Sequence, residues 1–346
     1  MARTKPLSWD EIYSQFDGLY QPHEQTYIPS GSVILDILFS DGKGVPVGTF
    51  IELYSQAGIG KSTCALHMCK QACQLGHKAI YLDVEHAVNP SQLSGIGLDP
   101  FIQSGLFKLY PIVSFKDAED IISSVIEDPD LAYIVIDSIT AMIPDPMLDK
   151  DASITDILPG LHARYSNMFL QKFKPLARRH NTTILLVNQM RTKLDFRRGG
   201  YDAPAGGNAL QYYCDIITQI KLKKKLEHTV LTGDGKSVVP YGSECEAITI
   251  KNKHANPYIP MTLTIFFGKG VSNNAAYLSW LDTAGHLDNN KAGGYTLKLP
   301  SGEYKARGMK KALDLVRDNI QEIKDLIQSN GGWRLLAGNQ QDEDDQ

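Results

Sequence analysis

Short apolar runs alternate with longer amphipathic stretches along the first two thirds of the chain. Runs of this length are typical of strands that are buried on both faces of a parallel sheet. The stretches 61–75 and 161–179 between them are predicted to be helices. The predicted strands are FIELYS (50–55), KAIYLDVE (78–85), AYIVIDS (132–138) and TTILLVNQ (182–189). Strands alternating with helices predict an α/β fold, with a mostly parallel, twisted sheet flanked by helices.

The pattern changes after residue 212. Stretches such as EAITIKNK and PMTLTIFF alternate between apolar and polar residues, which predicts antiparallel strands at one edge of the sheet between 212 and 268. Beyond His286, a linker rich in Gly, Asn and Lys leads to the segment 308–329, whose apolar residues recur on one side of a helix. We therefore expect one long helix in an α-rich C-terminal appendage.

The N-terminus predicts a small helix of its own. Ser8 and Glu11 have capping-box spacing, and the residues after them place apolar side chains on one helical stripe. Gly and Pro residues then indicate an extended linker. We divide the chain into an N-terminal helix with its linker (1–30), a core domain (31–285), a small C-terminal domain (286–335) and an acidic, disordered tail (336–346).

Composition narrows the functional classes. Hydrophobic residues make up 42% and charged residues 21% of the chain, which is ordinary for a globular protein. The net charge of -4 excludes a uniformly basic coat, so any contact with nucleic acid must be local. No apolar run reaches the ~18 residues of a membrane span, and we expect a cytoplasmic protein that does not contact membranes. The five cysteines form no CxxC pair, and we interpret them as reduced packing residues.

The strongest chemical signal is SQAGIGKST (55–63), between a predicted strand and a predicted helix. Backbone N–H groups of such a loop can surround phosphate oxygens, and Lys61 adds a charge for the β and γ phosphates. We expect the Ser62 hydroxyl to bind Mg²⁺ and Thr63 to donate a further hydrogen bond to a phosphate. The alternative is a glycine-rich turn that only caps a helix. The remaining predicted phosphate-loop residues are Ser55, in place of the usual first glycine, Gln56, Ala57, Gly58, Ile59 and Gly60.

Three further polar residues stand at the ends of predicted strands. Asp137 ends YIVID and fits a metal-binding carboxylate, although it could instead cap the next turn. Glu85 follows IYLDV, where a carboxylate could orient or deprotonate an attacking water. Gln189 ends ILLVNQ, where an amide could sense the γ-phosphate. Because carboxyl ends of parallel strands share one edge, we expect these side chains to meet around one nucleotide.

The segment 190–207 (MRTKLDFRRGGYDAPAGG) is the candidate nucleic-acid loop. Its cationic side chains can bind nucleic-acid phosphates, and its aromatic rings can stack on bases. We expect no helix or strand in this segment. A solvated lid is the alternative. A second candidate loop, 145–160, is acidic and precedes Arg164. KLKKK (221–225) is interpreted mainly as a solvated turn or strand edge, with DNA contact as the alternative. In the segment 190–207, the candidate contacts to nucleic acid are Arg191, Lys193, Phe196, Arg197 and Arg198.

From about Ile28 to about Leu287 the chain resembles the bacterial and phage RecA-type recombinases. YLDVEHA, VNQMR and GGNAL carry more weight than the phosphate loop, which many unrelated NTPases share. Other matching stretches are IPSGSVILD, IVIDSITAMIP, GLHARYSNMFLQKFKPLA and ITIKNKHANPY. The family usually has an aspartate at Asn89 and an aromatic residue at Gln92, so the contacts to adenine stay open.

The resemblance assigns roles by position. It implies that Glu85 activates water and that Gln189 couples the nucleotide to DNA. It makes the segments 146–160 and 190–206 the two DNA-binding loops. Lys251 and Lys253 would reach the ATP of a neighbouring subunit, and Tyr212 would cross the same interface. The DNA-contacting positions implied are Arg164, Arg191, Lys193 and the Gly206, Gly207 and Asn208 of GGNAL.

The resemblance also implies a function. The chain would be a DNA-dependent ATPase that uses ATP and Mg²⁺, forms a helical homo-oligomeric filament on single-stranded DNA, and exchanges strands with homologous duplex DNA. Single-strand-binding and loader proteins would be its further partners, in the cytoplasm of a bacterium or of a phage-infected host. The alternatives are a hexameric helicase-type motor of the same fold and a non-hydrolysing recombinase paralogue.

Overall fold

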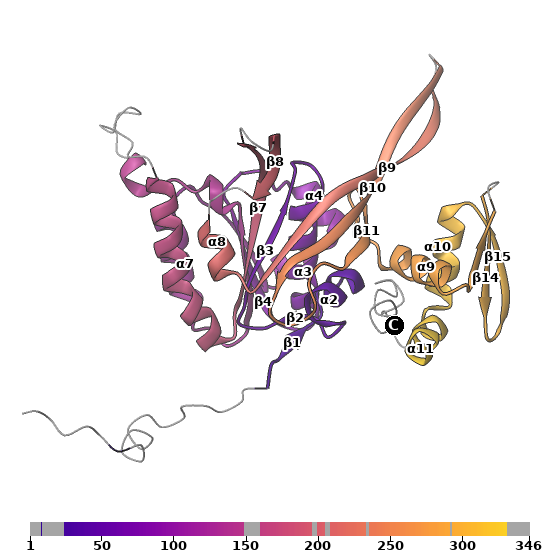
Figure 1. Cartoon of the computed structure of the whole chain (residues 1–346), viewed down its shortest axis with the longest axis horizontal. Helices are drawn as coiled ribbons and strands as arrows, with labels where there is room; N and C mark the ends of the chain where they lie inside the picture. Colours follow the sequence, from indigo (N-terminus) through magenta and orange to yellow (C-terminus); the bar gives the residue numbers. More distant parts are fainter. Residues whose placement is uncertain are drawn as a thin grey trace, which may run out of the picture.

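A large, mostly parallel sheet forms the centre of the molecule, and helices cover both of its faces (Figure 1). The computed structural model describes residues 8, 24–148, 160–195, 199–204, 208–232, 235–290 and 293–330. The strand order is β12-β11-β10-β9-β3-β7-β6-β4-β5, with β8 paired to β7. The parallel part consists of β3 (Phe50–Ser55), β4 (Lys78–Asp83), β5 (Phe107–Pro111), β6 (Leu131–Asp137), the first half of β7 (Thr183–Asp195) and the start of β9 (Ile216–Thr232).

Alternate residues of these strands enter two separate cores. In β6, Tyr133 and Val135 join one cluster, while Ile134 and Ile136 join the other. Because every residue of β6 is buried, apolar side chains are needed at consecutive positions. The α/β fold predicted from the apolar runs is therefore confirmed.

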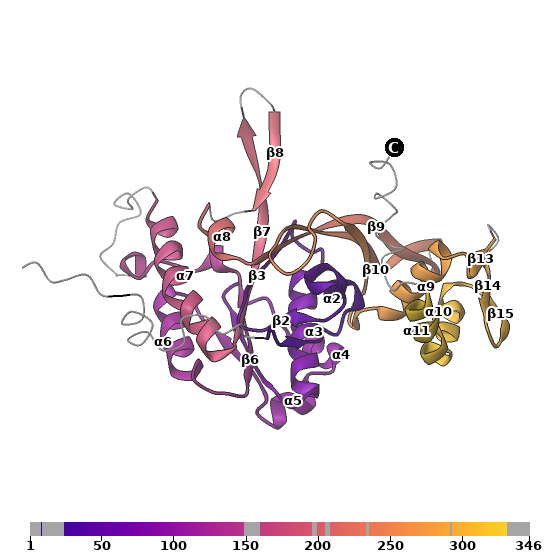
Figure 2. The ribbon, with the colours of Figure 1, turned by 60° about the horizontal axis from the view of Figure 1, so that its bottom comes forward.

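The helices divide between the two faces of the sheet (Figures 1 and 2). The first cluster lies under α2 (Val33–Ser40), α3 (Lys61–Gln74), α4 (Pro90–Ile96) and the short α5 (Asp99–Gln103). The second lies under α6 (Phe115–Val125), α7 (Leu161–His180) and α8 (Asn208–Tyr213). Two short 3₁₀ helices, η1 (Ile139–Ala141) and η2 (Asp145–Leu148), follow β6.

Antiparallel strands extend the sheet at one edge, as expected for 212–268. They are β9, β10 (Gly235–Asn252), β11 (Pro260–Phe266) and β12 (Gly270–Val271). β3 pairs with β9 only over Ile216–Gln219, and beyond that point the described part of β9 pairs with β10 alone. We call this paired extension of β9 and β10 the ribbon (Figure 2). The exposed residues 221–225 lie in it, so the interpretation as a solvated strand edge is confirmed.

The segment 190–207 differs from the prediction that it holds no regular element. β7 does not end near Gln189 but continues to Asp195, and β8 (Gly199–Pro204) runs back along it, from Asp195↔Gly199 to Met190↔Pro204. We call these paired segments the hairpin, which projects from the sheet (Figure 2). Its strands pair through backbone groups and have no apolar run, so the hydrophobic pattern gave no signal for it.

The C-terminal unit also differs from the expected single helix. α10 (Met309–Asp318) and α11 (Ile320–Ser329) are separated at Asn319, whose side-chain amide donates to the Leu315 carbonyl oxygen at 2.8 Å. The helical period continues across this break because both helices pack on the same core. The expected linker contains a three-stranded sheet, β13 (Leu287–Asn289), β14 (Gly294–Leu299) and β15 (Gly302–Arg307). α9 (Asn273–Thr283) also contributes to this core, through residues that precede the proposed boundary at 285.

At the N-terminal end, β1 (Tyr27–Ile28) lies in the segment expected to be a linker and pairs with β2 (Val45–Pro46) of the core. The predicted N-terminal helix, apart from Ser8, and the acidic tail lie outside the described residues. In the part of the chain that is described, no helix has both the length and the apolar character needed to cross a bilayer.

Candidate nucleotide-binding site

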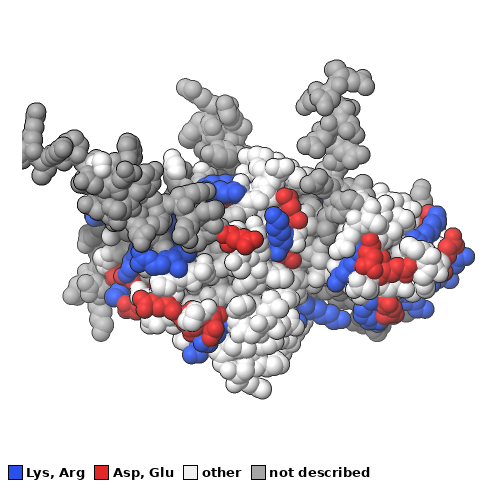
Figure 3. Space-filling view, turned by 90° about the horizontal axis from the view of Figure 1, so that it is seen from below, with Lys and Arg blue, Asp and Glu red and all other residues white. Residues whose placement is uncertain are grey.

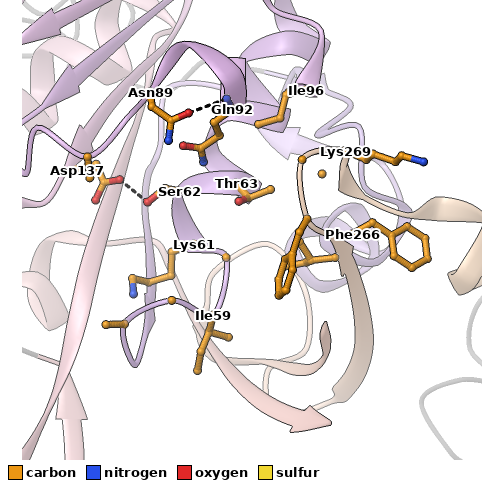
Figure 4. A pocket seen from close by; sticks show the side chains of 18 of the residues that line it. Ile59, Lys61, Ser62, Thr63, Asn89, Gln92, Ile96, Asp137, Phe266 and Lys269 are labelled. Atoms are coloured by element: carbon orange, nitrogen blue, oxygen red, sulfur yellow. Dashed lines mark hydrogen bonds between the residues drawn. The ribbon is translucent and has the colours of Figure 1, made fainter. Parts of the chain in front are cut away.

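A cleft of about 580 Å³ opens at the carboxyl ends of the central strands. The strand register brings these ends together: Ser55 of β3 is paired with Gln189 of β7, and Asp83 of β4 with Asp137 of β6. The cleft is lined by Lys61, Glu85 and other residues from well-separated parts of the sequence (Figure 4). The expected meeting of four strand ends is thus present in the structure.

The phosphate-loop segment connects β3 to α3. Gly58 (φ 74°) and Gly60 (φ 110°) have left-handed backbones, which favour glycine. Ser55 is the last residue of β3 and lies outside the positive-φ set, so glycine is not required there. Every residue from Ala57 to Thr63 lines the cleft, and α3 begins at Lys61 with its N-terminus at the loop. A loop of backbone N–H groups at a helix N-terminus is suited to bind an anion.

The Lys61 ammonium group folds back over the loop. It donates to the carbonyl oxygens of Ser55 (3.3 Å) and Gln56 (3.0 Å), and to the Ser55 hydroxyl oxygen (3.0 Å). Burial lowers the pKa of Lys61, while the nearby carboxylates of Asp137 and Glu85 act in the opposite direction. The hydroxyl of Ser55 thus takes part in holding the lysine, which glycine could not do.

Ser62 and Asp137 form a hydrogen-bonded pair across the cleft (Figure 4). The Ser62 hydroxyl donates to Asp137 Oδ2 at 2.6 Å. Burial raises the pKa of Asp137, and the negative charge of Glu85 adds to this, while hydrogen bonds from Ser62 and Tyr81 and the charge of Lys61 oppose it. Within the described residues no cluster of three or more His, Cys, Asp or Glu side chains could hold a metal by itself.

This pair of oxygen donors fits Mg²⁺ better than a metal held only by protein. Mg²⁺ is bound through one or two protein oxygens together with water and substrate phosphates. A hydroxyl and a buried carboxylate, already within hydrogen-bonding distance beside the phosphate-loop segment, match that requirement. A cation there would also compensate for the buried charge of Asp137.

Glu85 and Gln189 are joined at the mouth of the cleft. The Gln189 side-chain amide donates to Glu85 Oε1 at 2.8 Å. β4 ends at Asp83, two residues earlier than predicted, because the Asp83 carboxylate accepts hydrogen bonds from the backbone N–H groups of Ala87 and Val88 and turns the chain. Glu85 therefore lies in the loop after β4, where its side chain is exposed.

The turn between β11 and β12 completes the cleft, and the sequence did not identify it. Ile265, Phe266, Phe267 and the turn that follows line the cleft, and Figure 4 shows Phe266 and Lys269 on its side. This turn lies close against α4, since a Cβ on Gly95 would come 2.1 Å from the Gly268 carbonyl oxygen. The two glycines of FGKG indicate a turn, but no local pattern shows that it reaches the phosphate loop. Other lining residues not predicted are Ala87, Ser91 and Ile96.

Asn89 begins α4 and caps it. Its side-chain oxygen accepts from the backbone N–H of Gln92 at 2.9 Å and from the Ser91 hydroxyl at 2.7 Å. The oxygen of Asn89 is therefore already used for capping, so its amide nitrogen is the group better placed to contact a ligand.

Three residues expected at a subunit interface lie together, and none of them lines this cleft. Tyr212 is 76% exposed on α8, and the Lys251 ammonium group donates to the carbonyl oxygens of Gln211 and Tyr212. Lys253 forms an ion pair with Asp215 at 2.9 Å. Contact with the nucleotide of another subunit stays a prediction.

The expected DNA-contacting residues are only partly described. Arg164 is exposed in the first turn of α7, Arg191 and Lys193 stand on β7 within the hairpin, and Asn208 begins α8. The remaining ones, Phe196, Arg197, Arg198, Gly206 and Gly207, lie outside the described residues.

Among the residues that the structure describes, the face seen from below carries no broad basic area. Figure 3 shows Lys and Arg side chains interspersed with Asp and Glu, around a wide area that carries neither. This distribution agrees with the expectation from net charge that contact with nucleic acid must be local.

Comparison with known proteins places this arrangement in a family. A family model described as the RecA N-terminal domain matches residues 18–272. "Protein RecA" of Ruminococcus albus is 29% identical over 320 residues, covering 91% of this chain and 75% of that protein. "Protein RecA" of Salinispora tropica is 28% identical over 318 residues (91% and 86%), and that of Fusobacterium nucleatum is 33% identical over 245 residues (71% and 61%). With a family match over most of its length, the chain belongs to the RecA family and is a RecA-like recombination protein.

Proposed function

We propose that the chain is a DNA-dependent ATPase that binds ATP with Mg²⁺ in the cleft described above. The observation that carries the proposal is the convergence of Lys61, the Ser62–Asp137 pair and the Glu85–Gln189 pair on one cleft of about 580 Å³. This volume falls within the range of ~300–1,000 Å³ that is usual for small-molecule sites. Membership of the RecA family supports the same activity.

Each group has a proposed task in hydrolysis. The loop N–H groups and Lys61 bind the phosphates. When ATP binds, the Lys61 ammonium group replaces its hydrogen bonds to neutral oxygens of Ser55 and Gln56 by contacts with negatively charged phosphate oxygens. Ser62 and Asp137 would hold Mg²⁺, which neutralises charge on the β and γ phosphates when bound. Glu85 accepts a hydrogen bond now and can accept one from water, so it is the candidate base for the attacking water.

Gln189 is proposed to link the nucleotide to DNA. It is the last residue of β7 that pairs with β3, and the hairpin begins at the next residue, Met190. A phosphate that draws the Gln189 amide away from Glu85 would act on the strand that carries Arg191 and Lys193. The nucleotide could therefore change how the hairpin presents its cations to DNA phosphates.

At the level of the assembly, we propose a helical filament on single-stranded DNA. Lys251, Lys253 and Tyr212 lie outside the chain's own cleft, which is where groups must lie to reach a neighbour's nucleotide. A head-to-tail contact that does not close gives a helix. Arg164, Arg191 and Lys193 are the proposed DNA contacts, and base pairing with homologous duplex DNA would supply the specificity. Single-strand-binding and loader proteins would assist in the cytoplasm.

The test is ATP hydrolysis with and without single-stranded DNA, in the presence of Mg²⁺. The wild-type chain should hydrolyse ATP faster with DNA. Lys61→Ala should lose turnover because the phosphates lose their cation. Glu85→Gln should keep nucleotide affinity while its turnover falls by ~10²–10⁴-fold, the usual contribution of a general base.

Other outcomes would favour the alternatives. Nucleotide binding without hydrolysis in the wild-type chain would indicate a non-hydrolysing paralogue. Closed hexameric rings in electron micrographs of the complex with single-stranded DNA would indicate a helicase-type motor. An unchanged turnover in Lys61→Ala would contradict the proposed site itself.

A further inference from the structure

Tyr81 is a buried phenol that reaches the candidate metal carboxylate from the core. It lies on β4, its side chain belongs to the first hydrophobic cluster, and it has no exposed surface. Its hydroxyl donates to Oδ2 of Asp137, the same oxygen that accepts from Ser62 at 2.6 Å. The register of β4 and β6 permits this contact, since Tyr81 is paired with Val135, two residues before Asp137.

Loss of this hydrogen bond would destabilise both the Tyr81 hydroxyl and the Asp137 carboxylate, because both are buried. A buried hydroxyl that loses its partner regains none of the hydrogen bonds that it makes to water in the unfolded chain, which destabilises the fold. Asp137 is also buried, with 5% of its surface exposed, so water cannot freely replace a lost donor.

The two donors to Asp137 differ in what a metal would do to them. Ser62 lines the cleft, and its hydroxyl oxygen would turn to Mg²⁺ as a ligand, so it would no longer orient Asp137 in the same way. Tyr81 does not line the cleft and approaches from the interior. It is therefore the donor that can hold the carboxylate both before and after the metal arrives. Such outer partners orient a ligand so that little is lost when the metal binds.

We propose that Tyr81 is a positioning residue for the metal site: its hydroxyl fixes the orientation of Asp137 and so lowers the Mg²⁺ concentration at which ATP is bound. The inference rests on the proposed function, because it takes Ser62 and Asp137 as the Mg²⁺ ligands.

Tyr133 provides a matched control within the same core. It lies on the neighbouring strand β6, is 1% exposed and packs in the same cluster. Among the described residues its hydroxyl has no hydrogen-bond partner. Tyr133→Phe therefore removes a buried hydroxyl of the same kind without removing a bond to Asp137.

The experiment measures binding of a fluorescent ATP analogue as MgCl₂ is titrated, for the full chain and each variant. Tyr81→Phe should raise the half-saturating Mg²⁺ concentration by about tenfold, the lower end of the range for loss of an outer partner of a metal ligand. Binding of the analogue in excess EDTA should stay unchanged, because the phosphate loop is intact. Tyr133→Phe should match the wild type in both measurements.

A double variant separates a direct effect from general loosening of the core. In an Asp137→Asn background, adding Tyr81→Phe should cause no further shift in Mg²⁺ dependence if Tyr81 acts through that carboxylate. An additional shift of similar size, or equal shifts in Tyr81→Phe and Tyr133→Phe, would overturn the inference. So would no shift in Tyr81→Phe while the wild type depends on Mg²⁺. A wild-type chain whose nucleotide binding ignores Mg²⁺ would instead refute the proposed function.

Discussion

At the scale of single residues, the most unusual group is a carboxyl buried beneath the site. Glu52 has no exposed surface, accepts a hydrogen bond from the Asn188 amide at 2.7 Å, and has a second oxygen without a hydrogen-bond partner among the described residues. Burial raises the pKa of Glu52 to about 7, although the Asn188 hydrogen bond opposes this. Asn188 in turn accepts from the backbone N–H of Gln189, so this buried group lies directly beneath the proposed sensor.

The raised pKa of Glu52 predicts a pH-dependent stability. An acid whose folded pKa exceeds its unfolded value stabilises the fold fully below the unfolded pKa, and this contribution is lost as the pH rises through the folded pKa. The window runs from about 4.5 to about 7. At pH 8, Glu52→Gln should unfold with a free energy higher than that of the wild type by up to about 3 kcal/mol, because the amide need not ionise. Urea unfolding at pH 5 and pH 8 would measure this.

The control for this variant is Glu127→Gln, which changes an exposed carboxylate that does not line the cleft and should leave the difference between the two pH values unaltered. If Glu52→Gln were destabilised equally at pH 5 and pH 8, Glu52 would not be the titrating group.

At the scale of elements, the sequence predicted what depends on local pattern. Consecutive apolar residues identified β3, β4, β6 and the sheet-bound part of β7, and the loop motif identified the start of α3. Pairings between distant segments were missed. The hairpin has no apolar run in its sequence, the break at Asn319 preserves the helical period, and the turn at Gly268 lies against Gly95, which is distant in the sequence. The sequence does not distinguish Tyr81 from an ordinary core residue, because its hydrogen bond to Asp137 depends on which strands are neighbours.

The hairpin carries the clearest prediction at this scale. Arg191 stands on the strand that leaves the sheet just after Gln189, and we expect its cation to neutralise a DNA phosphate. Arg191→Ala should weaken binding to single-stranded DNA and lower the slope of log affinity against log salt by about 1. Fluorescence anisotropy of labelled oligonucleotides at several NaCl concentrations provides both quantities.

Lys310→Ala on α10 is the comparison variant, because Lys310 is an exposed lysine in the C-terminal unit. It should leave affinity and slope unchanged. An Arg191→Ala chain with wild-type affinity and slope would show that the hairpin does not bind DNA through this residue.

At the scale of the whole molecule, one cleft holds the groups proposed for hydrolysis, and another surface holds the cations proposed to reach a neighbouring subunit. Lys253 shares Asp215 with Lys174 of α7, whose ammonium group also contacts the Asp215 carboxylate. Asp215 therefore stays paired if Lys253 moves away, which limits the cost of leaving a buried charge alone.

Lys253→Ala should separate binding from assembly. The chain should fold, since Lys174 still pairs with Asp215, and it should bind the ATP analogue with wild-type affinity, since Lys253 does not line the cleft. Filaments on single-stranded DNA should be fewer and shorter in electron micrographs, and DNA-stimulated hydrolysis should fall in parallel. Lys305→Ala, an exposed lysine of β15, serves as the reference. Normal filaments from Lys253→Ala would exclude a role for this lysine between subunits.

The ribbon has a consequence for solubility. Over the exposed residues 221–225, β9 pairs with β10 on one side only, and an unpaired strand edge can recruit a strand from another molecule. Lysines at 221 and 223–225 keep that edge hydrated, and register shifts at Pro240/Gly242 and Glu244/Cys245 bend the paired strand. The filament proposed for this chain needs one defined contact between subunits, and these features disfavour unspecific strand pairing between copies.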